Sequence, residues 1–266
     1  MSIRIAVVLP SRGMSFSRTM EELLRELKGI DHEIFFSVGN PLPECFNIPI
    51  EDALQDDSFT HILIVEDDMI IPKGILKKML SKRYPAVALD YPFKNDNEAT
   101  VLHDPEGYAL YTGTGFLLVE RWVLDSIPDP IFRTDVAWDM MITKDNKLVI
   151  WPRDVSKIKT YGLHDVNFGL TLWSNGLPIV VMDKTAGQRK LKSKGTPNSN
   201  NGADKIYELT KVLRDNTAKS SNTQLVKGYL DRFHRVNEVV LLDKCPDTIH
   251  YVDGQARLRE GKDIVI

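Results

Sequence analysis

Apolar residues follow two different spacings in the first two thirds of the chain. Continuous apolar runs at residues 3–9, 33–38 and 61–65 are typical of buried strands. Apolar residues recur every three or four positions over 17–27 and in a helix opened by Pro72, as in amphipathic helices. This alternation predicts an α/β fold with helices on both faces of a sheet. Further predicted strands lie at 86–89, 108–111, 115–119 and 178–182, and further helices at 48–54 and 166–175.

Residues next to these segments predict where helices begin and end. Ser17 is a suitable N-cap for the first helix, because its hydroxyl can accept a bond from a free backbone N–H group. Gly176 follows the helix at 166–175, at the place where a left-handed C-cap is common.

The last third of the chain has a different pattern. Residues 197–202 (PNSNNG) predict a loop, which is followed by helical spacing over 203–214 and 223–236 and a short strand at 239–242. We therefore predict a catalytic domain over residues 1–195 and a basic, mostly helical C-terminal extension over residues 196–266.

Composition excludes several classes of protein. Of the 266 residues, 42% are hydrophobic and 27% are charged, an ordinary globular balance that excludes wholesale disorder. No apolar run approaches the roughly 18 residues that a bilayer span needs, so no membrane span is expected. Cys45 and Cys245 lie far apart and in no metal-binding spacing, which favours a reduced cytoplasmic setting, although one disulfide stays open.

Charge is unevenly distributed along the chain. Between residues 184 and 235, twelve Lys and Arg face four Asp and Glu, a local balance of +8, so the rest carries −11 of the total of −3. A solvated basic helical surface is the simplest interpretation. A stripe that follows a phosphate backbone is the alternative.

Three consecutive carboxylates, Glu66, Asp67 and Asp68, follow the apolar run at 61–65. A solvated loop, or a helix N-terminus whose dipole favours carboxylates, accounts for them without a function. A Mg²⁺ or Mn²⁺ ion completed by substrate phosphates accounts for them equally well. The cluster alone does not separate these two interpretations.

Five short stretches, in order along the chain, resemble the motifs of inverting nucleotide-sugar glycosyltransferases with the GT-A fold. Residues 91–94 (YPFK) also resemble versions of this family found in phage and bacterial genomes. The resemblance implies a Rossmann-like mixed sheet, and it covers about residues 3–190. The five stretches are 8–12, 45–54, 60–69, 111–121 and 163–176.

The resemblance also implies a role for individual residues. Asp68 would bind the metal directly, Glu66 would face the ribose or the metal, and Asp67 occupies the variable middle position. Asp165 would be the catalytic base, which implies inversion at the anomeric carbon. A helix N-cap is the simpler account of Asp165. Donor-binding residues implied in the same way are Pro10, Arg12, Asn47, Lys94, Gly113, Thr114 and Gly115.

One position departs from the family pattern. Where many relatives have a histidine that completes the metal site, this chain has Gln188, whose amide oxygen is a weaker ligand. His164 is an alternative metal-facing group. The residues between the glycine-rich turn and Asp165 are expected to be irregular and to shape the acceptor site, with Trp138 either stacking on a sugar or base or simply half-buried.

The expected activity is metal-dependent transfer of a sugar from a nucleoside-diphosphate sugar, with a UDP-sugar favoured, to a hydroxyl group. The basic segment 184–235 suggests DNA as a partner, with a hydroxymethylated pyrimidine as acceptor, in the host cytoplasm if the protein is phage-encoded. A surface glycan, a lipid-linked sugar or a protein are other acceptors. A Mg²⁺-dependent nucleotidyltransferase and a non-catalytic binding protein are the other classes.

Overall fold

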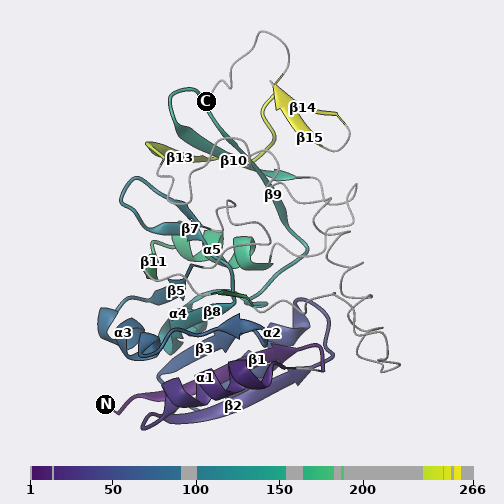
Figure 1. Cartoon of the computed structure of the whole chain (residues 1–266). Coiled ribbons are helices and arrows are strands. Elements are labelled where there is room, and N and C mark those ends of the chain that lie inside the picture. The colour runs from purple at the N-terminus through teal and green to yellow at the C-terminus, as the bar shows by residue number, and fades with distance from the viewer. Residues whose placement is uncertain are drawn as a thin grey trace, which may run out of the picture.

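The computed structural model describes residues 2–13, 15–90, 101–153, 164–182, 187–188, 236–247, 249–252 and 255–258. Its centre is an eight-stranded mixed sheet with the strand order β2-β1-β3-β8-β5-β11-β7-β6 (Figure 1). The predicted sheet is therefore confirmed. Its strands are β1 (Arg4–Ser11), β2 (Asp31–Val38), β3 (His61–Val65), β5 (Ala86–Leu89), β6 (Leu102–His103), β7 (Ala109–Tyr111), β8 (Phe116–Glu120) and β11 (Ile179–Met182).

The direction of the strands decides which loops meet. β1 runs parallel to β2 and to β3, and β5 runs parallel to β11. Between these two parallel groups, β8 runs antiparallel to both β3 and β5. Val65, the last residue of β3, is therefore paired with Phe116, the first residue of β8. The segment after β3 and the segment before β8 meet at one edge of the sheet.

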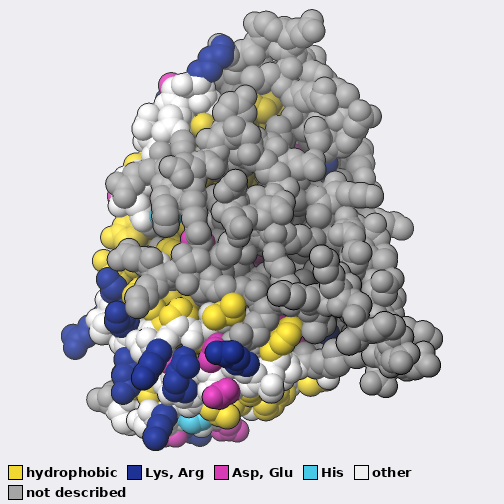
Figure 2. Space-filling view, viewed as in Figure 1, with side chains coloured by type: hydrophobic (Ala, Val, Ile, Leu, Met, Phe, Trp, Pro, Cys, Tyr) yellow, Lys and Arg dark blue, Asp and Glu magenta, His cyan; other side chains and the backbone are white. Residues whose placement is uncertain are grey.

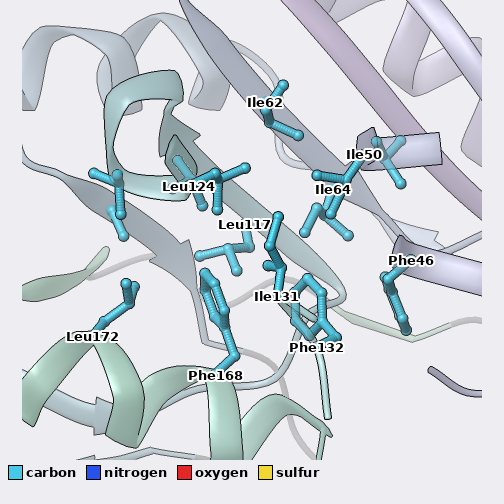
Figure 3. Close-up of a cluster of buried hydrophobic side chains, with 14 of the residues drawn as sticks. Phe46, Ile50, Ile62, Ile64, Leu117, Leu124, Ile131, Phe132, Phe168 and Leu172 are labelled. Carbon is cyan, nitrogen blue, oxygen red and sulfur yellow. The ribbon is translucent and has the colours of Figure 1, made fainter. Parts of the chain in front are cut away.

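Helices cover both faces of the sheet, as predicted. Alternate residues of β1 point to opposite sides, so Ala6 and Val8 belong to one apolar cluster, whereas Ile5 and Val7 belong to the other. The first cluster is drawn in Figure 3, where Phe46, Phe132 and Phe168 lie close together. It packs against α2 (Glu44–Leu54), α4 (Arg121–Ser126) and α5 (His164–Ser174), and the second cluster packs against α1 (Ser17–Leu27) and α3 (Ile75–Lys82).

Helix starts differ from the prediction more than helix ends do. Ser17 is the first residue of α1 and not its N-cap, which is Phe16, without a side-chain bond. α3 begins at Ile75, after the N-cap Gly74 (φ 77°), and not at Pro72. Met69–Ile70 form the short strand β4. Gly176 does follow α5 in the left-handed conformation (φ 71°).

The segment expected to be irregular is a β-hairpin. β9 (Ala137–Ile142) pairs antiparallel with β10 (Lys147–Arg153). The hairpin turns at Asn146, which has a φ of 62°. The buried run at 148–151 explains the strand, since an apolar stretch of this length matches a strand covered on both sides. Trp138 is half-buried, as the simpler interpretation held.

The described elements of the C-terminal segment are strands. β13 (Glu238–Leu241), predicted at 239–242, pairs parallel with β10, and β14 (Ile249–Val252) forms a hairpin with β15 (Gln255–Leu258). The helix predicted at 203–214 lies outside the described residues, and so does the helix predicted at 223–236 apart from Val236, which is not helical; the domain boundary at 195 stays a prediction. Neither Cys45 nor Cys245 forms a disulfide bond. None of the helices in the described ranges has the length and hydropathy needed to cross a bilayer.

Candidate functional site

The candidate site forms where the carboxyl end of β3 meets the start of β8. The backbone N–H of Glu66 donates to the carbonyl oxygen of Gly115 at 3.0 Å. Arg12 follows β1, the strand next to β3, and its guanidinium offsets a small part of the rise in pKa that burial causes at Glu66 and Asp67. The fold thus brings the first-strand loop, the acidic cluster and the glycine-rich turn together, as the resemblance implied.

The acidic cluster is electrostatically crowded. Asp68 is 7% exposed, and Glu66 and Asp67 are half-buried. Burial and the Asp68 carboxylate raise the pKa of Glu66. Burial also raises the pKa of Asp67, against the effect of a hydrogen bond from the Ser11 side chain. A bound cation would relieve this repulsion, so the cluster suits a metal better than it suits a solvated loop.

The donor set fits a hard divalent cation that shares its coordination with substrate. Within the described ranges, no three His, Cys, Asp or Glu side chains gather to hold a metal. Mg²⁺ commonly takes one or two carboxylates and completes its shell with water and substrate phosphates. Glu66 and Asp68 match that pattern. Oxygen ligands of this kind suit Mg²⁺ and Mn²⁺.

Backbone pairing between two short strands places Gln188 next to the acidic cluster. β12 (Gly187–Gln188) pairs antiparallel with β4, and Gln188 lies opposite Met69, the residue that follows Asp68. The chain position predicted to complete the metal site is therefore next to the acidic cluster. Its role as a ligand stays a prediction.

Thr114 in the glycine-rich turn contacts both the acidic cluster and the start of α5. Its side chain is 2% exposed, and its hydroxyl donates to Oε1 of Glu66 at 3.0 Å. The same hydroxyl lies 3.3 Å from Nε2 of His164, at the start of α5. Gly113 and Gly115 flank Thr114 in this turn.

The first turn of α5 carries His164 and Asp165. The His164 ring stacks on Phe46 at 4.8 Å, and burial lowers the pKa of His164. Asp165 is the second residue of α5, and its Oδ1 accepts a bond from the backbone N–H of Val166 at 2.9 Å. After burial and the Asp68 carboxylate, the carboxylate of Asp165 also raises the pKa of Glu66, so the predicted base lies near the acidic cluster. The structure brings both residues to the site, with the nitrogen of His164 directed at a hydroxyl.

Asn47 has a partner that the sequence did not reveal. Its Nδ2 donates to the carbonyl oxygen of Phe132 at 2.9 Å, and its Oδ1 accepts from the N–H of Phe132 at 2.9 Å. Asn47 is buried and joins α2 to the loop before β9. The contact with a nucleotide implied by the resemblance stays a prediction. Pro10 is buried in β1, Arg12 is exposed, and Lys94 lies outside the described residues.

Two carboxylates of α1 hold the loop that follows the acidic cluster, and the sequence pattern did not predict their role. Glu22 accepts a bond from the N–H of Ile71 at 2.9 Å, and Glu26 accepts bonds from Gly74 and Leu76 at 2.8 and 3.3 Å. The available signal was their position, four residues apart on the same helix face as Leu23 and Leu27. Acidic residues within an apolar stripe are buried only with hydrogen-bond partners.

Comparison with protein-family models finds no match, and neither does comparison with curated protein sequences. Solved structures give distant likenesses. The STIV protein A197 is 14% identical, with 74% of this chain and 100% of that chain covered and a TM-score of 0.44.

Two further likenesses were solved with ligands. One is a mutant Drosophila β-1,4-galactosyltransferase 7 in complex with manganese, UDP-Gal and xylobiose. It is 17% identical, with 77% of this chain and 79% of that chain covered and a TM-score of 0.37. The other is glucosyl-3-phosphoglycerate synthase from Mycobacterium tuberculosis, in complex with Mn²⁺, UDP-glucose and phosphoglyceric acid. It is 13% identical, with 86% of this chain and 81% of that chain covered and a TM-score of 0.40. At such values the neighbours assign no function, which must come from the chemistry of the site.

Proposed function

We propose that the protein is a metal-dependent glycosyltransferase that moves a sugar from a nucleoside-diphosphate sugar to a hydroxyl acceptor. One observation carries the proposal. The carboxylates of Glu66, which is half-buried, and Asp68, which is buried, stand at a strand end. A third carboxylate, Asp165, follows His164 at the start of α5, and Thr114 contacts both His164 and Glu66. A metal between carboxylates and a separate base are the two chemical requirements of this reaction.

Each carboxylate has a distinct task in the proposed reaction. Asp68 and Glu66 would hold Mn²⁺ or Mg²⁺, with Gln188 beside them. The metal would neutralise the diphosphate as the bond to the sugar breaks. Asp165 would take the proton of the attacking hydroxyl on the opposite side of the sugar, which gives inversion. Arg12, exposed beside the acidic cluster, would contact the donor nucleotide or its phosphates.

A donor screen tests the transfer. Full-length protein would be incubated with Mn²⁺ and single UDP- or GDP-sugars while the release of nucleoside diphosphate is followed, starting with UDP-Gal and UDP-glucose. Asp68→Ala should abolish release. Asp165→Asn should lower the transfer rate by about 10²–10⁴-fold, the usual contribution of a general base. Glu21→Gln, an exposed acidic residue of α1, is the control and should keep the wild-type rate. Full activity in Asp165→Asn would exclude it as the base.

DNA is the acceptor that we propose, with a hydroxymethylated pyrimidine as the reacting base. The +8 balance over 184–235 is the support, because phosphate contacts by Lys and Arg dominate DNA affinity. In the described part, residues 69–89 add five Lys and Arg and no acidic residue. Filter binding should show an affinity for DNA that falls as salt rises. No affinity at low salt would leave a glycan, a lipid-linked sugar or a protein as acceptor.

Nucleotidyl transfer is the second candidate, favoured by one feature. Arg12 and Gly13 follow β1 and lie by the acidic cluster, as a phosphate-binding loop of that class would. The product separates the two reactions. Release of a nucleoside diphosphate indicates sugar transfer, whereas release of pyrophosphate indicates nucleotidyl transfer. Donor binding without either product would indicate a non-catalytic protein.

A further inference from the structure

Thr114 stands between Glu66, which the proposed reaction assigns to the donor, and the first turn of α5, which carries the proposed base Asp165. Its hydroxyl donates to Oε1 of Glu66 at 3.0 Å and lies 3.3 Å from Nε2 of His164. A threonine hydroxyl has a single proton, and here that proton is directed to Glu66. The contact with the imidazole is then a hydrogen bond only if Nε2 carries a proton and donates it to the threonine oxygen.

The ring of His164 is held by its neighbours. It stacks on Phe46, with ring centres 4.8 Å apart and planes 24° apart, and it also packs against Phe132 at 6.0 Å. Its Nδ1 is buried and has no hydrogen-bond partner among the residues that the structure describes. Two aromatic contacts thus leave the imidazole a single described polar partner, the hydroxyl of Thr114.

We infer that Thr114 and His164 are positioning residues, which hold the Glu66 carboxylate in one orientation and connect it to the first turn of α5. The inference rests on the proposed function, in which Glu66 serves the donor and Asp165, the neighbour of His164 in sequence, serves the acceptor. The contacts from Glu66 through Thr114 to His164 would then fix the position of the Glu66 carboxylate relative to that of Asp165.

The physical basis is the crowding around Glu66. Its carboxylate is close to Asp68, and Asp68 is buried whereas Glu66 is half-buried. A donated hydrogen bond compensates a buried carboxylate, and without it the side chain would turn toward another donor or toward solvent. A displacement of about 1 Å in such a site can lower the rate by about 10²-fold. Loss of the Thr114 hydroxyl should therefore affect the rate more than the affinity for the donor.

The first test concerns the tautomer and needs no substrate. Full-length protein labelled with ¹⁵N-histidine would be examined by NMR near pH 7.5, and the His164 signals would be identified by their absence in His164→Gln. A neutral ring protonated at Nε2 is expected. In Thr114→Val the Nε2 signal should shift, because its acceptor is gone. A ring protonated at Nδ1, or signals unchanged in Thr114→Val, would overturn the inference whatever the protein's activity.

The second test uses matched pairs of variants. Thr114→Val keeps the shape and removes the hydroxyl, whereas Thr114→Ser keeps the hydroxyl. His164→Phe keeps a ring to stack on Phe46, whereas His164→Gln keeps a nitrogen that can donate. The expected result is a 10- to 100-fold lower kcat for Thr114→Val and His164→Phe, with KM for the donor changed less than about threefold. Thr114→Ser and His164→Gln should recover most of the rate.

Thr171→Val is the control, because it removes a threonine hydroxyl that bonds the carbonyl oxygen of Asn167 within α5, away from Thr114. It should keep the wild-type kcat. If Thr114→Val and Thr114→Ser lose equal activity, or if both match the wild type, the positioning role is wrong. If the wild type neither binds UDP with Mn²⁺ nor releases nucleoside diphosphate, the proposed function fails, and the tautomer test still decides the hydrogen-bonded chain.

Discussion

A single thiol shows how strongly burial and charge act at this site. Cys45 on α2 is 8% exposed, and burial, followed by the nearby Glu66 carboxylate, raises its pKa to about 12. At neutral pH the side chain is therefore a protonated, apolar group that packs in the core. The thiolate is the reactive form of cysteine, so this position is chemically inert while the protein is folded.

The thiol predicts a pH dependence of stability. The unfolded thiol loses its proton near pH 9, whereas the folded one keeps it to about pH 12. The unfolded state therefore holds fewer protons between these values, and stability should fall as pH rises, by about 1.4 kcal/mol per pH unit. Urea unfolding at pH 8, 9 and 10 measures the slope. Cys45→Ala should show a shallower decline, and an equal slope in both proteins would contradict the assignment.

Removing the Asn47 side chain should lower the stability of the fold, and this effect can be measured separately from donor binding. Asn47→Ala removes both bonds to the backbone of Phe132 and leaves that buried N–H and C=O without them. We expect unfolding to be easier by about 2–4 kcal/mol in urea titrations. Asn40→Ala, at an exposed position, should cost less than about 1 kcal/mol. Normal stability together with lost nucleotide affinity would instead support the contact implied by the resemblance.

These residues show how far sequence reasoning reaches at the residue scale. The motif order predicted that Glu66, Asp68, Thr114 and Asp165 would share a site, and the fold brings them together. It did not predict which of them touch. Asn47 is 85 positions from Phe132, and Thr114 is 50 positions from His164. Side-chain partners at such separations depend on strand order and register, which one sequence does not contain.

At the scale of elements, the approach of α5 to β7 decides where Asp165 lies. A Cβ added at Gly169 would come within 2.5 Å of the Cα of Tyr111 and 2.8 Å of the carbonyl oxygen of Leu110. Both atoms belong to the backbone of β7 and cannot move aside. The glycine therefore sets the distance between the helix and the sheet, and with it the position of the first turn.

Gly169→Ala should displace α5 and impair the site. The methyl group would destabilise the fold by about 1–3 kcal/mol, as overpacking does, and the rate of transfer should fall as Asp165 moves. Gly176→Ala is the matched control, because its φ of 71° makes it strained, although nothing lies within 4 Å of the added Cβ. It should cost about 1 kcal/mol and keep the rate. Thermal unfolding and donor turnover would be measured together, and equal turnover in both variants would contradict a positional effect.

Periodicity predicted most elements because their apolar residues face one core. It failed where the deciding contact is distant in sequence. The start of α3 is set by Glu26, which accepts bonds from Gly74 and Leu76. The hairpin was missed because the charged residue Asp139 interrupts the apolar pattern of β9. Asp139 is fully buried and forms an ion pair with Arg153 at 3.5 Å.

For the whole molecule, charge does not divide as simply as the totals suggested. The sequence placed the basic excess in residues 184–235 and left an acidic remainder. The space-filling view shows Lys and Arg side chains gathered over α1 and α3, inside the region expected to be acidic (Figure 2). Lys77, Lys78 and Lys82 of α3 are exposed. A polyanion therefore has a basic surface within the described fold as well, although the residues outside 184–235 are acidic in total.

Residues on the two sides of the predicted domain boundary at residue 195 contact one another in the structure. β13 pairs with β10, and Lys147 and Glu238 form an ion pair across them at 2.8 Å. Val236 is 1% exposed and belongs to the apolar cluster of Leu148 and Ile150. Residues on both sides of the boundary thus share one sheet and one apolar cluster.

A chain ending at residue 195 should therefore be less stable than the full chain. It would expose the apolar side chains that Val236 covers and one edge of β10, at a cost of about 2 kcal/mol or more. We expect a lower Tm and stronger binding of the dye ANS. Val236→Asp in the full chain should act in the same direction, since it places an unpaired charge in that cluster, whereas Glu238→Gln at the exposed rim should change Tm little. A fragment that melts at the temperature of the full chain would instead support independent folding up to residue 195.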